Sequence, residues 1–192
     1  MAFKKEILEI IEPKDIFVGN TDAPITLMEF GEYENEDCAK ANEVVKQLLE
    51  EYGDDINFVF RHFPLTNVHQ KAHKAAEAAI GAGQEGRFWE MHQLLFAHRR
   101  NLGVISLKSY AREAGVKDKR FLDHLMNSDW GVYVQDDLRE GLDLGIREIP
   151  VMFVNDELVE KEITLKNIKA RIDTLLKAEA PTLLKAKSKK RA

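Results

Sequence analysis

Cysteine is almost absent from this sequence, since Cys38 is the only one among 192 residues. A single cysteine excludes a disulfide within the chain and any zinc site built on two thiolates. Such low cysteine usage also fits a reducing compartment. We therefore expect a cytoplasmic protein.

Long apolar runs are absent as well, and no stretch reaches the roughly 20 residues that a membrane-spanning helix needs. Near the start, Lys4 and Lys5 precede apolar residues, as lysines do in a signal peptide. However, Glu6, Glu9 and Glu12 interrupt that run, and no small-residue cleavage site follows it. Their spacing favours a short amphipathic helix, so we expect no association with a membrane.

Basic residues are outnumbered, with 28 lysines and arginines against 33 aspartates and glutamates and a formal net charge of -5. This balance disfavours a general nucleic-acid binder. Hydrophobic residues make up 44% of the chain, enough for a core, and the length suits one domain over residues 1–180. Residues 181–192 are basic and low in complexity, and we expect a disordered tail there.

Recognisable metal and nucleophile motifs are missing too. His69 and His73 are four residues apart, but no glutamate follows His69 as in H-E-x-x-H, and zinc would need further ligands. Glu34 and Asp37 show no ligand spacing either. No serine lies in a nucleophile-elbow context, and no glycine-rich phosphate loop is present. We expect no bound metal, and histidines that are solvated or cap a helix.

The first third of the chain is expected to form a β-α-β unit. Residues 25–30 are mostly apolar, which is typical of a buried strand. Asn35 is a suitable N-cap for a helix that ends near Gly53, and residues 56–60 form the next strand. This order predicts a parallel pair of strands joined by a crossover helix.

The middle of the chain is expected to be helical, and strand character returns only after it. The expected helices cover residues 69–82, 88–98, 106–114 (with Ser106 as a cap), 117–126 and 129–144. Residues 151–154 and 158–159 predict a hairpin with a turn at Asn155 and Asp156, and a last helix starts near Thr164. Because a short sheet must bury both faces, the two strand-bearing halves are expected to join into one sheet. The helical block over about residues 66–147 then caps one end.

Five segments resemble the DsbA-like family of thioredoxin-fold proteins. Their sequences are EFGEYENEDCA, RHFPL, AAEAA, FWEMH and IPVMFVN, at residues 29–39, 61–65, 75–79, 88–92 and 149–155. They occur in the family's order over about residues 17–178. The resemblance implies an α/β thioredoxin-like fold with an α-helical insertion, in a family of thiol-disulfide oxidoreductases.

The resemblance also assigns roles to single positions. The family carries a C-x-x-C motif at the start of its first helix, where Cys38 matches the second cysteine and Asn35 stands in place of the first. Pro150 matches a cis-proline that faces the active site. Glu29 matches a buried acid beneath the cysteines that assists proton transfer.

A peptide-binding groove is a further implication of the resemblance. In thioredoxin-like proteins the residue before the cis-proline presents its backbone to an extended peptide, and here that residue is Ile149. By analogy, Tyr33, Glu34, Ile149 and Pro150 line the groove.

The asparagine at the first motif position excludes dithiol chemistry within one chain. In the family the first cysteine is the attacking thiolate, which the helix N-terminus favours. The second cysteine then resolves the mixed disulfide. Because the amide of Asn35 cannot form a disulfide, this cycle has no first step here.

Cys38 itself is expected to be an unreactive core residue. The second motif position is usually the more buried one, and Glu32, Glu34, Glu36 and Asp37 lie nearby in the sequence. Negative neighbours raise the pKa of a thiol. A normal or raised pKa leaves little thiolate at neutral pH.

Three hypotheses for the function follow. The preferred one is a binding module without redox turnover or cofactor, whose acidic groove would favour basic peptide or protein clients. The alternative is a monothiol oxidoreductase, in which Cys38 forms a mixed disulfide with glutathione or a protein and an external thiol resolves it. Glutathione conjugation, known in some relatives with this insertion, is disfavoured because Asn35 replaces their hydroxyl or thiol. The sequence leaves the client and the oligomeric state open.

Overall fold

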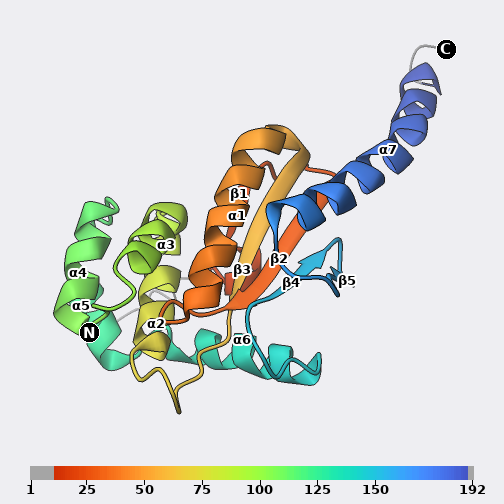
Figure 1. The fold of residues 1–192 in the computed structure, drawn as a ribbon. Coiled ribbons are helices and arrows are strands. Elements are labelled where there is room, and N and C mark those ends of the chain that lie inside the picture. Colours follow the sequence, from red (N-terminus) through yellow and green to blue (C-terminus); the bar gives the residue numbers. More distant parts are fainter. Residues whose placement is uncertain (1–10, 190–192) are drawn as a thin grey trace.

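The computed structural model describes residues 11–189, with side chains as far as residue 178. Five strands form one sheet in the order β1-β3-β2-β4-β5 (Figure 1). The strands are β1 Phe17–Gly19, β2 Ile25–Gly31, β3 Ile56–His62, β4 Val151–Val154 and β5 Glu157–Leu158. β2 and β3 pair in parallel, and every other neighbouring pair is antiparallel. The expected union of a β-α-β unit and a hairpin in one sheet is therefore confirmed.

Strand β1 is an element that the sequence pattern does not predict. It has only three residues, too few for an alternation of apolar and polar side chains to stand out. Its pairing with β3, in which Phe17 lies opposite Val59, fixes it as an edge strand.

Seven helices accompany the sheet in the described residues. They are α1 Glu36–Tyr52, α2 Ala72–Gly83, α3 Phe88–Ala97, α4 Val104–Glu113, α5 Phe121–Asn127, α6 Gly131–Asp143 and α7 Leu165–Lys189, with short 3-10 turns η1 Pro13–Asp15 and η2 Gly53–Asp55. The N-cap of α4 is Gly103 and not Ser106, which lies inside the first turn and donates to Asn101. No helix among residues 11–189 is long and apolar enough to cross a membrane.

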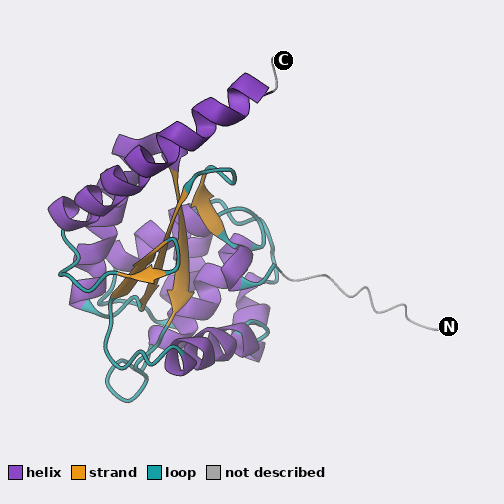
Figure 2. Cartoon of the chain, turned by 90° about the vertical axis from the view of Figure 1, so that its right-hand side faces the viewer, coloured by secondary structure: helices purple, strands orange, loops and turns teal. Residues whose placement is uncertain are grey.

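Helix α7 continues into the region expected to be a disordered tail, since it is helical as far as Lys189. Its C-terminal part projects beyond the rest of the domain (Figures 1 and 2). Residues 190–192 lie outside the described residues, and so do residues 1–10, which hold most of the expected N-terminal amphipathic helix.

The helices form layers around the sheet. Helices α1 and α7 pack together and against β3 and β2, whereas α6 packs against β3 from the opposite face. Helices α2 to α5 gather into a block beside α1, on the left in Figure 1. One large hydrophobic core joins the sheet to α1, α7 and this block, and a smaller cluster of Phe30, Phe63 and Ile146 lies near α6.

A buried ion pair fixes α6 to the end of β3. Nε of Arg61 lies 2.6 Å from Oδ1 of Asp137, and the two side chains are 6% and 2% exposed. Oδ2 of Asp137 also accepts the backbone N–H of His62 at 2.9 Å. Because α6 leads directly into the loop before Pro150, this anchor holds that loop in place.

The β4–β5 hairpin turns at Asn155 and Asp156, as predicted. Both residues have a positive φ, of 50° and 65°, which asparagine and aspartate tolerate better than most residues. Asn155 also accepts the N–H of Thr26 at 2.7 Å and donates to the carbonyl of Pro24 at 3.1 Å. The hairpin is thereby fastened to the start of β2.

Candidate functional site

The N-terminus of α1 is capped by the residue that stands in place of the missing cysteine. Oδ1 of Asn35 accepts the backbone N–H groups of Asp37 at 2.8 Å and Cys38 at 3.0 Å. This confirms the predicted N-cap. The side chain of Asn35 therefore has a structural task, since it satisfies two of the free N–H groups at the helix start.

Cys38 lies inside the core. Its exposed fraction is 0%, which confirms the predicted burial. Burial raises the pKa of the Cys38 thiol well above its ordinary value, and the nearby carboxyl of Glu29 raises it further. The acids near Cys38 in sequence, the buried Glu32 and the exposed Asp37, raise its pKa less than burial does. This direction agrees with the expected normal or raised pKa of Cys38, and burial is its main cause.

Glu29 and Cys38 meet beneath Gly31. A Cβ placed on Gly31 would lie 3.0 Å from Oε1 of Glu29 and 3.1 Å from Sγ of Cys38, so only glycine fits there without displacing them. Glu29 is 1% exposed, and neither of its carboxyl oxygens has a hydrogen-bond partner among the described residues. Burial raises the pKa of this carboxyl well above its usual range.

Replacing Glu29 with glutamine is expected to raise the free energy of unfolding at pH 8 and to have little effect at pH 4, because only the carboxyl can ionise. The carboxyl has a higher pKa in the folded chain than its ordinary value of 4.5. The stability that the protonated carboxyl of Glu29 contributes to the fold is therefore fully present below pH 4.5. It is lost as the pH rises toward the pKa of this carboxyl in the folded chain. Urea unfolding of Glu29→Gln between pH 4 and 9 tests this.

The matched control for Glu29 is Glu50→Gln on the exposed side of α1. It should follow the wild type at every pH. If Glu29→Gln and the wild type show the same pH dependence, the carboxyl of Glu29 ionises as freely in the folded chain as in the unfolded one.

Two of the four acids expected to make an acidic groove instead hold the loop between β3 and α2. Glu32 is buried, accepts the backbone N–H of Leu65 at 2.8 Å and contacts Nδ1 of His69. Glu34 accepts the backbone N–H of Lys71 at 2.8 Å. These carboxylates fasten the loop to the start of α1.

The other two acids are paired with cations on the surface. Glu36 lies 3.0 Å from Nη2 of Arg99, and Asp37 lies 2.8 Å from Nζ of Lys40. All four carboxylates therefore have partners within the chain. These pairings reduce the negative charge that Glu36 and Asp37 present to a basic client, and they turn Glu32 and Glu34 toward the chain itself.

Tyr33 does not line a groove, which corrects the position assigned to it by analogy. Its side chain is fully buried, with its ring 5.3 Å from that of Phe60 and 4.9 Å from that of Phe96. Its hydroxyl lies 3.0 Å from Nδ1 of the buried His92, whose Nε2 lies 3.2 Å from Oδ1 of Asn42. Burial lowers the pKa of His92, so the ring is neutral, donates from Nε2 and accepts the hydroxyl of Tyr33.

The peptide bond between Ile149 and Pro150 is cis, as the resemblance implies. Beside it lies a groove of about 580 Å³, named here the proline groove. It is lined by Asp37, Lys40, Ala41, Pro150, Val151, Met152 and residues 158–163. No hydrogen bond among the described residues uses the N–H or C=O of Ile149. Glu34 and Ile149 are half-buried and are not among the lining residues.

The sequence does not predict most of the residues that line the proline groove. Lys40 and Ala41 come from the second turn of α1, and residues 158–163 form the segment between β5 and α7. No motif marks these residues, because they meet only when the hairpin folds back beside α1.

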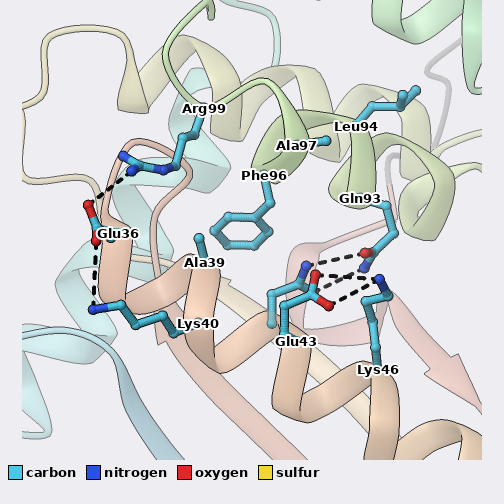
Figure 3. A pocket seen from close by; sticks show the side chains of 11 residues that line it. Glu36, Ala39, Lys40, Glu43, Lys46, Gln93, Leu94, Phe96, Ala97 and Arg99 are labelled. Atoms are coloured by element: carbon cyan, nitrogen blue, oxygen red, sulfur yellow. Dashed lines mark hydrogen bonds and ion pairs between the residues drawn. The ribbon is translucent and has the colours of Figure 1, made fainter.

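A second hollow of about 500 Å³ lies between α1 and α3 (Figure 3). Phe96 points into it, and charged side chains stand around it. Arg99 is paired with Glu36, and Lys46 lies 3.3 Å from a carboxylate oxygen of Glu43. Because its cations are already neutralised within the chain, we assign no ligand to this hollow.

No group of three or more His, Cys, Asp or Glu side chains in the described part of the chain is arranged to hold a metal ion. His69 and His73 do not act together: His69 contacts Glu32, and His73 lies 3.1 Å from Glu77. Each histidine is partly exposed and has its own carboxylate.

Comparison with known proteins agrees with this architecture. A family model described as Thioredoxin matches residues 12–174. The protein named Na(+)/H(+) antiporter NhaA 1 of Salinispora arenicola is 37% identical over 160 residues, which cover 81% of this chain and 24% of the antiporter. The chain spans about a quarter of the length of the curated relatives that it matches.

Solved structures show the same fold. Oxidised BdbD from Bacillus subtilis superposes with a TM-score of 0.78 at 22% identity, covering 86% of this chain and 93% of that one. The α-DsbA1 protein of Wolbachia pipientis gives a TM-score of 0.75 at 22% identity, covering 92% and 98%. The predicted thioredoxin-like α/β fold with a helical insertion is confirmed.

Proposed function

Because this chain belongs to the thioredoxin family, in its DsbA-like branch, and retains one cysteine of a degenerate C-x-x-C motif, we propose that it is a binding domain without redox turnover. It holds an extended peptide or protein segment in the proline groove. The observation that carries this proposal is the contrast between the open groove at Pro150 and the fully buried Cys38.

The backbone of Ile149 supports a peptide ligand. Its N–H and C=O have no partner among the described residues, although they lie beside a groove of about 580 Å³. Such unpaired groups are suited to pair with an extended chain, which supplies the complementary donors and acceptors. Apolar groove residues, among them Val151 and Ile163, suit the side chains of that segment.

The state of the thiol argues against the monothiol alternative. A mixed disulfide requires a thiolate that an incoming disulfide reaches, and Sγ of Cys38 is buried with a raised pKa. Reactive cysteines lie in partly exposed, electropositive surroundings, whereas Cys38 has the carboxyl of Glu29 beside it. We therefore assign no cofactor, glutathione included.

The test is the binding of a library of fluorescein-labelled ten-residue peptides, measured by fluorescence anisotropy. The variant Glu162→Trp places an indole at an exposed lining residue of the proline groove. It is expected to weaken the binding of selected peptides about tenfold or more, the effect of losing a central interface contact. The variant Cys38→Ala should bind as tightly as the wild type.

The matched control is Lys166→Trp, which adds the same side chain at an exposed residue outside the groove. It should leave the affinity unchanged. If no peptide binds above background, or if Glu162→Trp binds like the wild type, the proline groove is not the binding site. Loss of binding in Cys38→Ala would instead favour thiol chemistry.

A further inference from the structure

Strand β5 leaves a row of backbone groups open at one edge of the sheet. Val159 donates its N–H to the carbonyl of Met152 at 2.9 Å, and Phe153 lies opposite Leu158. In an antiparallel pair, hydrogen-bonded and non-hydrogen-bonded residues alternate. The N–H and C=O of Leu158 therefore point away from β4, and those of Glu160 would continue the same row. Outside the strand ladder, no hydrogen bond among the described residues engages the backbone of either residue.

A groove accompanies this open edge. It has a volume of about 550 Å³ and lies between residues 157–161 and one face of α7, and we name it the edge groove. The α7 face consists of Asn167, Ala170, Arg171 and Thr174, which are spaced three or four residues apart. An extended peptide can add as a strand to an exposed sheet edge, where neighbouring pockets take its alternate side chains.

One face of the sheet carries a continuous row of apolar side chains that ends at β5. The register places Phe17, Val59, Met28, Phe153 and Leu158 side by side across all five strands. Phe17 and Leu158, at the two ends of the row, are 41% and 54% exposed. A sixth strand beside β5 would extend the row and cover Leu158.

From this geometry we propose that the edge groove is a second binding site, which takes an extended peptide segment as a sixth strand of the sheet. The segment pairs with the outward N–H and C=O of Leu158. Its side chain beside Leu158 is apolar, and the alternate side chains, which face Ala170 on α7, are small or polar. Residues 158–161 line both grooves, but the opposite wall is α7 in the edge groove and α1 with Pro150 in the proline groove.

The hairpin is already ordered for this role. Its two-residue turn is fixed to β2 through Asn155, and its other end is held where the carbonyl of Glu162 accepts from Thr164 and Asn167. An ordered edge loses little conformational entropy when a strand adds to it. Glu157 and Arg171 neutralise each other across the groove, so charge does not select the segment.

The experiment is a titration of the ¹⁵N-labelled chain with the peptide acetyl-Lys-Val-Thr-Val-Thr-Lys-amide, followed by NMR. We expect the largest shifts at the amides of Leu158 and Glu160. The variant Leu158→Pro removes one outward donor and is tolerated at an edge strand. It should weaken binding roughly threefold or more, because it removes one hydrogen bond and also the leucine side chain that the segment covers.

A second variant tests the site without changing the hairpin, in case Leu158→Pro disturbs its folding. Ala170→Trp fills the edge groove from an exposed position of α7 and should abolish the shifts, whereas Lys177→Trp, exposed on α7 outside the groove, should leave them unchanged. Glu162→Trp should also leave them unchanged, which separates this site from the proline groove. Shifts confined to residues around Pro150, or no shifts at all, would overturn the proposal. So would self-association of the chain through β5, which would make a second copy the occupant.

Discussion

Replacing Asp137 with alanine is expected to destabilise the domain by about 3–5 kcal/mol, as the loss of one partner from a buried ion pair usually does. The change leaves the guanidinium of Arg61 buried with only the half-exposed Glu140 as a partner. It also removes the acceptor for the N–H of His62. Chemical unfolding monitored by circular dichroism measures the change.

The control for Asp137 is its neighbour Asp136, whose carboxylate pairs with Arg139 on the surface. Asp136→Ala should cost less than about 0.5 kcal/mol, because exposed ion pairs contribute little. Adding Arg61→Met to Asp137→Ala should recover part of the lost stability, since the unpaired cation is removed. If the two single alanine variants are equally stable, the ion pair does not anchor α6.

Alkylation of Cys38 by iodoacetamide at pH 7.5 is expected to be at least about 100-fold slower in the native protein than in the unfolded chain. The reagent must wait for an opening of the core, which costs on the order of 3 kcal/mol or more. The raised pKa of the thiol lowers the thiolate fraction further. Intact mass spectrometry at timed intervals measures the rate, and oxidised glutathione should give no adduct in the native state.

The variant Glu29→Gln provides a matched comparison for Cys38, because it removes the nearby carboxyl without exposing Sγ. Alkylation should stay slow in this variant, since burial is the larger cause of the raised pKa. Rapid alkylation of the native wild type, with one glutathione per chain, would contradict the binding-domain proposal and favour a monothiol enzyme.

Local sequence was sufficient wherever the cause of the structure is local. The side chain of Asn35 reaches the N–H groups of its own helix, so its capping role follows from a few neighbouring residues. The turn at Asn155 and Asp156 and the β-α-β order are equally local. Boundaries moved by a few residues, and the three-residue β1 was missed because long-range pairing alone creates it.

The composition alone determined one functional conclusion. One cysteine cannot cycle between a dithiol and a disulfide within the chain, whatever the fold. The tertiary structure decided what surrounds that cysteine. Glu32 and Glu34, which look like an acidic surface in the sequence, are occupied by backbone N–H groups from the loop after β3. The side chain of Tyr33, which the resemblance placed in the peptide-binding groove, is buried in the core.

The two grooves likewise belong to the tertiary structure. The proline groove forms only where the second turn of α1 meets residues 158–163, and the edge groove only where α7 crosses beside β5. Motifs and short-range spacing in a sequence indicate which helix or strand a residue belongs to, but not which distant residues it contacts. Burial, ion pairing and open backbone edges depend on segments far apart in the sequence, such as Arg61 with Asp137 or Lys40 with Lys161, so only the folded chain determines them.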